Sequence, residues 1–190
     1  TMTIYDFTDW DGNIECEEWV SNLNDCNQDD VQFLIELKDM DDPLNLGVQY
    51  WENGRLISMY CDIMCGLSGE IPIEVGNLDS LKSLDLHNNG LSGDIPSEIG
   101  NLSSLINLTI DGNSLTGSIP SEIGSLTNLE MLYLSNNNMN GTIPDNICNL
   151  MNLNWIGLYN NSFCPPYPEC LTEEDVGYQF TSECPLCDEG

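Results

Sequence analysis

Basic residues are nearly missing from this sequence of 190 residues. Three Lys and Arg stand against 32 Asp and Glu, which gives a formal net charge of −29 at pH 7. A surface of this sign repels the phosphates of nucleic acids and the headgroups of anionic membranes, so it argues against both as partners. It attracts cations and cationic partners instead. The simplest interpretation of this charge is adaptation to salty or marine surroundings, and the alternative is a dedicated acidic docking surface.

Long apolar runs and histidine are also scarce. No stretch approaches the ~20 apolar residues that a membrane span needs, which argues against membrane insertion. His87 is the one histidine and follows Asp85 closely, so we interpret it as a solvated surface residue. We therefore expect neither a catalytic set nor an enzyme, and no cofactor. The chain begins at Thr1, and we interpret it as a mature chain whose targeting segment was removed or not included.

Between residues 67 and 162, by contrast, a unit of 24 residues occurs four times in tandem. Each unit opens with a variant of L-x-G-x-I-P and continues into a core of the form L-x-x-L-x-L-x-x-N. The opening residues are Leu67, Leu91, Leu115 and Met139, and the closing asparagines are Asn89, Asn113, Asn137 and Asn161. A fixed period of this length predicts a solenoid.

The core of the unit alternates with period two, which predicts a short strand with one buried face. One strand per turn predicts a parallel sheet, and each turn needs its neighbours to close a core. The asparagine column follows each strand, so its amides are expected to pair with the backbone of adjacent turns and form a ladder. The glycines at positions 76, 100 and 124 are expected to permit a tight turn after each Ile-Pro pair.

With these motifs the sequence resembles the leucine-rich repeat family, and the L-x-G-x-I-P segment resembles its plant-type subclass. The resemblance implies a right-handed α/β solenoid with a parallel β-sheet on its concave face and disulfide-bonded caps at both ends. We therefore expect three parts. Residues 1–66 form an N-terminal cap with a helix, a hairpin and a degenerate first repeat, residues 67–162 form four repeats, and residues 163–190 form a Cys-rich C-terminal cap.

The N-terminal cap carries two recognisable local patterns. A helix is expected over residues 26–40, capped by Asn27 or Asp29. Its expected apolar stripe is Val31, Leu34, Ile35 and Leu37. A hairpin is expected over residues 48–61 around the turn Asn53-Gly54.

The second hairpin strand resembles a degenerate repeat, with Met59 and Cys61 at the inward positions and Cys65 in the asparagine column. Further upstream, Asp9 to Asn13 superficially resemble a calcium loop. This segment fails the EF-hand spacing, so calcium is only a weak candidate ligand.

The nine cysteines gather at the two ends of the chain, which predicts an oxidising compartment and a secreted or cell-surface protein. The resemblance implies disulfides in both caps. One expected group is Cys16, Cys26, Cys61 and Cys65, and the other is Cys148, Cys164, Cys170 and Cys184, with the pairing open in each. Cys187 is then left over. Zinc is the alternative at the C-terminal end, because Cys184-x-x-Cys187 has a ligand-like spacing.

The outward strand positions line the concave face, where the family usually binds its partners. On the last two turns these positions hold apolar and aromatic residues, and on the first two they are polar. The expected ligand-binding residues are Met131, Tyr133, Trp155, Tyr159, His87 and Asp111. The alternative is that the C-terminal cap folds over the aromatic group. Candidate N-glycosylation sites are Asn101, Asn107, Asn140 and Asn160.

The function expected from these features is a non-catalytic extracellular recognition module that binds a protein, peptide or glycan on its concave face. The alternative is a self-assembling structural subunit of an extracellular filament, matrix or surface layer. It is motivated by the odd number of cysteines and by an acidic surface that divalent cations can bridge. A third hypothesis, inhibition of a secreted hydrolase, rests on a resemblance to plant polygalacturonase-inhibiting proteins.

Overall fold

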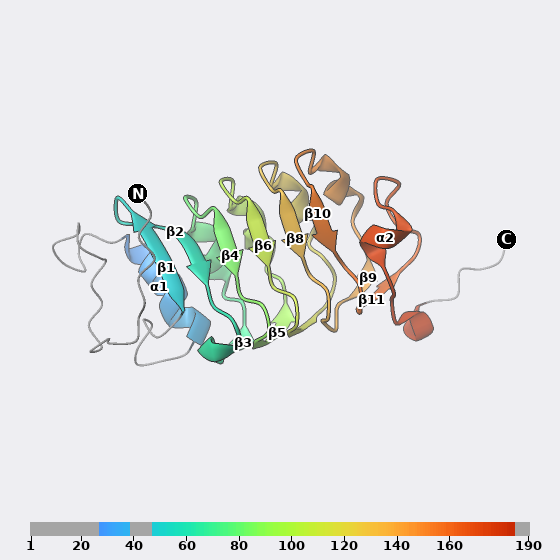
Figure 1. Ribbon diagram of the computed structural model, residues 1–190, viewed down its shortest axis with the longest axis horizontal. Helices are drawn as coiled ribbons and strands as arrows, with labels where there is room; N and C mark the ends of the chain where they lie inside the picture. Colours follow the sequence, from blue (N-terminus) through green and yellow to red (C-terminus); the bar gives the residue numbers. More distant parts are fainter. Residues whose placement is uncertain (1–26, 39–46, 185–190) are drawn as a thin grey trace.

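The computed structural model describes residues 27–38 and 47–184, which form one elongated, curved right-handed solenoid (Figure 1). Its front layer is a sheet with the strand order β1-β2-β4-β6-β8-β10. The bounds of these strands are β1 Val48–Glu52, β2 Arg55–Tyr60, β4 Ser83–Asp85, β6 Asn107–Thr109, β8 Met131–Tyr133 and β10 Trp155–Gly157. From β2 onward the strands are parallel, and Leu84, Leu108 and Leu132 pair in register. The repeat period of the sequence is therefore the strand-to-strand step of the sheet.

The N-terminal end is closed by helix α1 (Gln28–Lys38) and by the hairpin of β1 and β2. Asn27 caps α1, since its side-chain oxygen accepts from the backbone N–H groups of Asp29 and Asp30. The hairpin turns at Asn53 and Gly54, both with positive φ, as the Asn-Gly pair predicts.

A buried ion pair joins α1 to the hairpin, and the sequence pattern did not reveal it. The Asp30 carboxylate is fully buried and accepts from Nε and Nη2 of Arg55, both at 3.0 Å. It also accepts from the backbone N–H of Leu56 at 2.7 Å. A buried carboxylate without these partners would be costly, so Arg55 holds the cap helix in one position. Phe33, which lay outside the expected apolar stripe, is also fully buried.

Two further layers complete each turn behind the concave sheet. One is a lateral set of short parallel strands, which the sequence pattern did not predict: β3 Ser68–Glu70, β5 Gly90–Asp94, β7 Ser114–Thr116, β9 Asn140–Thr142 and β11 Ser162–Cys164. The other consists of 3₁₀ helices: η2 Ile63–Cys65, η3 Ile73–Asn77, η4 Ser97–Asn101, η5 Ser121–Ser125 and η6 Asp145–Asn149. The leucine and isoleucine columns of all four repeats fill the space between these layers.

The repeated glycines serve close packing rather than a tight turn, which corrects the expectation from sequence. None of the three has a positive φ. A Cβ added at Gly100 would lie 2.6 Å from the carbonyl oxygen of Glu122, and one at Gly124 would lie 2.4 Å from that of Asn146. Glycine is therefore required because consecutive 3₁₀ helices approach so closely. In the fourth turn the same position is Cys148, whose sulfur is bonded to Cys170.

The asparagine ladder runs through the interior as the sequence predicts. At Asn137 the side-chain oxygen accepts from the N–H of Leu115 at 3.0 Å, and the amide nitrogen donates to the carbonyls of Ile110 and Leu134, both at 3.1 Å. Corresponding bonds are made by Asn89, Asn113 and Asn161. Each rung thus satisfies backbone groups of its own turn and of the preceding one.

The ladder ends on a glutamine that the sequence pattern did not identify. Gln179 follows helix α2 (Glu173–Val176) and precedes η7 (Thr181–Glu183). Its side-chain oxygen accepts from the N–H of Phe163 at 3.2 Å, and its amide donates to the carbonyls of Leu158 at 2.9 Å and Val176 at 2.7 Å. These are the roles of a ladder asparagine, so Gln179 is the terminal rung.

Disulfides lie at both ends of the part of the chain that the structure describes. At the N-terminal side Cys61 is bonded to Cys65. At the C-terminal side the pairs are Cys148–Cys170 and Cys164–Cys184. Cys16, Cys26 and Cys187 lie outside the described residues, and so does the segment from Asp9 to Asn13.

Candidate functional site: a divided concave face

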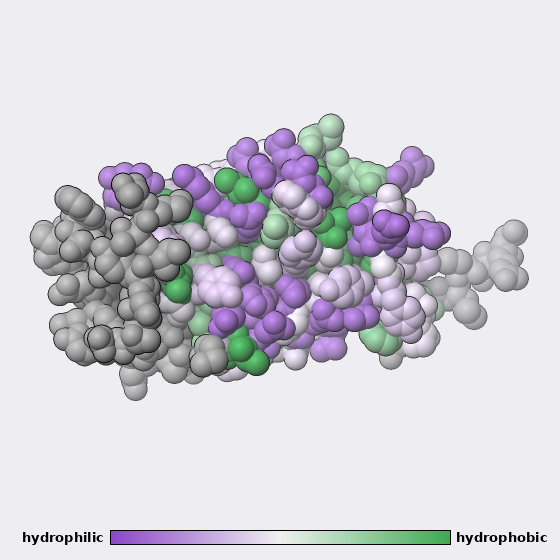
Figure 2. All heavy atoms as spheres, viewed as in Figure 1, coloured by the Kyte–Doolittle hydropathy of each residue, from purple (hydrophilic) through white to green (hydrophobic). Residues whose placement is uncertain are grey.

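The concave face is formed by the outward side chains of the front sheet and of the residues that follow its strands. Strand pairing places Ser83, Asn107, Met131 and Trp155 in one row, and Asp85, Thr109, Tyr133 and Gly157 in a second. A third row follows, with His87, Asp111, Ser135 and Tyr159. The front view in Figure 2 shows this face as mostly hydrophilic or intermediate, with strongly hydrophobic residues only scattered over it.

One end of this face, which we call the acidic half, consists of Tyr60, Asp62, Asp85, His87 and Asp111. Nδ1 of His87 lies 2.6 Å from Oδ1 of Asp85. The His87 ring also meets the ring of Tyr60 edge-on, with the ring centroids 5.7 Å apart. Tyr60 and Asp62 were not among the residues expected from sequence. The alignment of Met59 and Cys61 with the inward positions was the signal that could have identified them, because their neighbours alternate outward.

The pKa shifts in the acidic half reflect its carboxylates and the partial burial of its side chains. The pKa of His87 is raised, first by the hydrogen bond to Asp85 and then by the charges of Asp85, Asp111 and Asp62, against an opposing effect of burial. Burial is the main cause that raises the pKa of Asp111. Burial also raises the pKa of Tyr60, with further contributions from Asp62 and Asp85. The acidic half is thus a region of negative potential that favours protonated His87.

This arrangement predicts the titration of His87. We expect its pKa, measured by NMR of the ring protons, to lie above the ordinary 6.5, and to fall in the variant Asp85→Asn. Because the folded-state pKa is raised, the stability that His87 contributes is present below its unfolded-state pKa and is lost as pH rises through the folded-state value. An unchanged pKa in Asp85→Asn would contradict the role of this hydrogen bond.

The other end of the face, the aromatic half, consists of Met131, Tyr133, Trp155 and Tyr159. Trp155 is 52% exposed and Tyr159 is 44% exposed. Tyr133 lies over Gly157, since a Cβ added there would be 2.7 Å from Cδ1 of the tyrosine ring. No charged residue occurs in the outward rows of β8 and β10. This half is therefore an apolar and aromatic surface beside a charged one.

The C-terminal cap reaches the edge of the aromatic half. A Cβ added at Gly177 would lie 2.6 Å from Cβ of Tyr159, so the end of α2 packs directly against this residue. The N–H of Asn160 donates to the carbonyl of Tyr178. The exposed fractions of Trp155 and Tyr159 show that the cap abuts these rings without covering them.

The four candidate glycosylation asparagines lie on different surfaces. Asn101 ends η4 on the convex side, and Asn140 begins β9 on the lateral side, both exposed. Asn107 belongs to the concave face itself. Asn160 follows Tyr159, and its side chain donates to Oδ1 of Asn136 at 2.8 Å.

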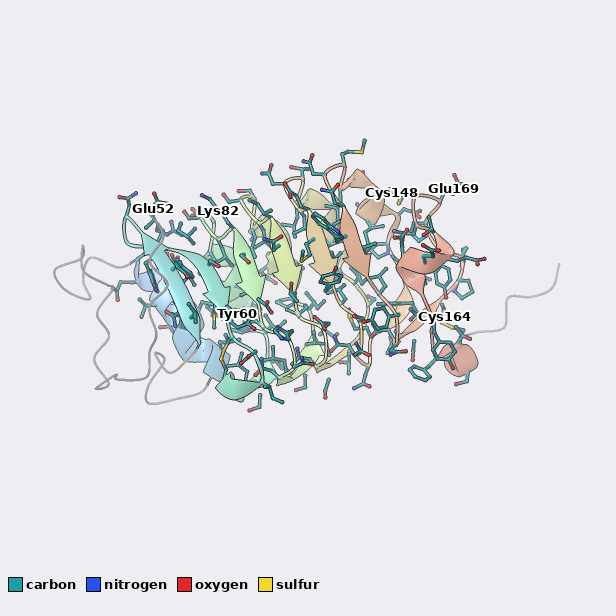
Figure 3. The ribbon with its side chains drawn as sticks, in the orientation of Figure 1. Glu52, Tyr60, Lys82, Cys148, Cys164 and Glu169 are labelled. Carbon is teal, nitrogen blue, oxygen red and sulfur yellow. A yellow bond between two sulfur atoms is a disulfide. The ribbon has the colours of Figure 1, made fainter. Side chains whose placement is uncertain are left out.

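A shallow depression of about 320 Å³ lies at the opposite edge of the sheet from Tyr60 (Figure 3). Glu52, Arg55 and Lys82 contribute to its lining. The Arg55 guanidinium is already paired with Asp30 and Asp79. The basic charge at this place is therefore largely balanced by nearby carboxylates, and we assign it no ligand.

The described residues offer neither a metal site nor a membrane-spanning helix. Among residues 27–38 and 47–184, no three His, Cys, Asp or Glu side chains gather in a way that could hold a metal ion. Neither helix in this part of the chain has the length and apolar character needed to cross a membrane.

Comparison with known proteins decides the family. Residues 60–159, just over half of the chain, match the model of a leucine-rich repeat region. The chain belongs to the leucine-rich repeat family. No curated protein is significantly similar to this leucine-rich repeat protein in sequence.

Solved structures extend the likeness of this leucine-rich repeat protein to plant ectodomains. The ectodomain of BIR2 from Arabidopsis thaliana is 30% identical with a TM-score of 0.62, over 80% of this chain and 88% of that one. The match from the BIR3–SERK2 complex of Arabidopsis is 37% identical with a TM-score of 0.61, over 66% and 69%. The match from the structure of Arabidopsis HAESA with the peptide hormone IDA and the co-receptor SERK1 is 31% identical with a TM-score of 0.59, over 65% and 21%.

Proposed function

We propose that this leucine-rich repeat protein is a non-catalytic extracellular recognition module that binds a peptide or protein partner across its concave face. The observation that carries the proposal is the aromatic half, where half-exposed rings stand on the last two turns of the front sheet. Large aromatic side chains dominate the energetics of protein interfaces, and exposed groups of them mark interaction sites.

The comparisons support a polypeptide partner. The similar structures include a complex of two plant proteins and a receptor kinase with its peptide hormone and co-receptor. This chain matches only about a fifth of that receptor kinase chain, so the partner class is carried over as a proposal. The cysteines support an extracellular place, because three disulfides in the described residues need an oxidising compartment.

The concave face also supports a binding role over a catalytic one. Its histidine holds a carboxylate through Nδ1 and packs against a tyrosine ring. Within the described residues no hydroxyl or thiol group is hydrogen-bonded to His87, so the pairing that activates a nucleophile is not built there. The pair of His87 and Asp85 serves instead to set the charge of the face.

The test is selection of peptides followed by removal of the aromatic rings. A displayed library of random peptides is selected on the secreted protein, and the binders are measured against the variant Tyr133→Ala/Trp155→Ala/Tyr159→Ala. We expect a loss of affinity of roughly a hundredfold or more, because aromatic anchors typically contribute about 2 kcal/mol or more each.

The matched control removes an aromatic pair elsewhere. Tyr178 and Phe180 are 66% and 52% exposed and stack edge to face in the C-terminal cap, outside the concave rows. The variant Tyr178→Ala/Phe180→Ala is expected to bind as the wild type does. Full affinity in the triple variant would refute the concave site, and binding to a glycan array but to no peptide would replace the proposed partner class.

A further inference from the structure

We infer that the partner of the concave face is an extended polypeptide segment of mixed character. It places a basic side chain over β4 and β6 and an apolar or aromatic side chain over β8 and β10. This inference rests on the proposed function and adds the chemistry and the spacing of the partner.

Charge is separated along the concave face. The carboxylates of the concave face lie in the acidic half, on Asp62, Asp85 and Asp111. The basic residues whose side chains the structure describes, Arg55 and Lys82, line the depression at the other edge of the sheet. An acidic group of a partner would therefore be repelled at this end, while a basic group would find several carboxylates at once.

The Asp111 carboxylate is partly buried and accepts a hydrogen bond from the backbone, and no side chain of the described residues donates a hydrogen bond to it. The carboxylate of Asp85, by contrast, is already held by the His87 ring. Partial burial weakens the hydration of a carboxylate, so an arriving ammonium or guanidinium group gains more here than at an open surface. Asp111 is thus the anchor that we assign to the basic side chain.

The spacing of the strands sets the distance between the two side chains of the partner. Adjacent strands of a sheet lie about 4.8 Å apart, so β6 and β10 are separated by about 10 Å and β4 and β10 by about 14 Å. An extended chain that crosses the strands advances about 3.3 Å per residue. Asp111 and Tyr159 stand in the same row, on the turns of β6 and β10. A basic residue over Asp111 and an aromatic residue beside Tyr159 are therefore about three positions apart in the partner, and about four where the basic residue lies over the turn of β4.

The test uses the peptides selected on the secreted protein at low ionic strength. We expect Lys or Arg to be enriched three or four positions from Trp, Tyr, Phe or Leu. We also expect Asp85→Asn/Asp111→Asn to weaken the binding of such a peptide roughly tenfold at low salt and to flatten its salt dependence. Replacing the basic residue of the peptide by glutamine should remove most of the difference between the variant and the wild type.

The control removes the same charge from the convex side. Glu98 and Glu122 lie on η4 and η5 and are hydrogen-bonded to neighbouring serines. The variant Glu98→Gln/Glu122→Gln has the same net charge as the acidic-half variant, and we expect it to keep the affinity of the wild type within about twofold. Equal losses in the two variants would show a general charge effect and would overturn the inference.

The outcomes separate this inference from the proposed function. Peptides that lose binding in the aromatic triple variant, yet show no basic enrichment and no response to Asp85→Asn/Asp111→Asn, leave the concave site standing and refute its charge preference. Peptides that ignore the aromatic triple variant refute both. Circular dichroism of each variant excludes unfolding as the cause of a loss.

Discussion

Replacing Asn137 with leucine is expected to lower the free energy of unfolding by about 3 kcal/mol. Asn137 is buried, with 7% of its surface exposed, and its amide serves the N–H of Leu115 and the carbonyls of Ile110 and Leu134. Leucine has nearly the same size but neither donates nor accepts, so these groups stay buried and unpaired. Each such group costs about 1–3 kcal/mol, and partial relaxation keeps the total near the upper end of that range.

The measurement is equilibrium unfolding in urea or guanidinium chloride, followed by circular dichroism. The control is the same substitution one residue later, because Asn138 is exposed and contributes only its backbone to the ladder region. Asn138→Leu is expected to change stability by less than about 0.5 kcal/mol. Equal effects at the two positions would mean that the side-chain ladder does not carry the stability assigned to it.

Replacing Phe163 with alanine is expected to cost about 3–5 kcal/mol, the largest effect of a single truncation in the C-terminal part of the molecule. Phe163 is fully buried in β11 at the last turn of the core, where the C-terminal cap begins. Truncation removes a large apolar surface and leaves a cavity at the end of a solenoid that has only one neighbouring turn to close it.

The readout is again chemical unfolding, joined with hydrogen exchange of the cap. Exchange in Phe163→Ala should rise most in the segment around α2 and Gln179, since Gln179 bonds to the backbone of Phe163. Phe180→Ala is the control, because this ring is half exposed and its loss should cost well under 1 kcal/mol. Uniform exchange across all turns would contradict a local role for Phe163.

The repeats could be predicted from sequence because each position is observed four times. A leucine at one position is weak evidence of burial, whereas a column of Leu84, Leu108, Leu132 and Ile156 indicates one face of a sheet. The same holds for the asparagine column, whose inward position and ladder follow from its place after each strand. The hairpin was predicted for another reason, since Asn-Gly is a strong local signal that needs no repetition.

Features that depend on one contact could not be found in this way. The pair of Asp30 and Arg55 joins residues 25 positions apart, and Asp30 looks like any other acidic residue in the first turn of a helix. The repeated glycines were assigned to a turn because sequence shows the residue but not its neighbour. Only the position of the next 3₁₀ helix shows that a Cβ would collide there.

The residues of the concave face could be predicted from the alternation of each strand. Whether the face is open to a partner could not be predicted. Whether the C-terminal cap lies over Trp155 or beside it depends on the path of residues that share no repeat. The structure places the end of α2 against Tyr159 and leaves both rings about half exposed. The division of the face into two halves likewise appears once the rows are assembled across the strands.

The terminal rung, Gln179, affects whether copies of the solenoid can polymerise end to end. A solenoid polymer would lengthen by adding each new subunit's first turn to an end whose ladder groups are still open. At the C-terminal end those groups are taken, because Gln179 occupies the N–H of Phe163 and the carbonyl of Leu158, and Phe180 donates to the carbonyl of Asn161. Gln179 follows Asn161 by 18 residues, whereas the ladder asparagines are 24 residues apart. The extra methylene group of glutamine reaches across this shortened turn. Gln179 thus acts as a chain terminator in the sense of polymer chemistry. A second copy cannot extend the asparagine ladder at that end without displacing Gln179.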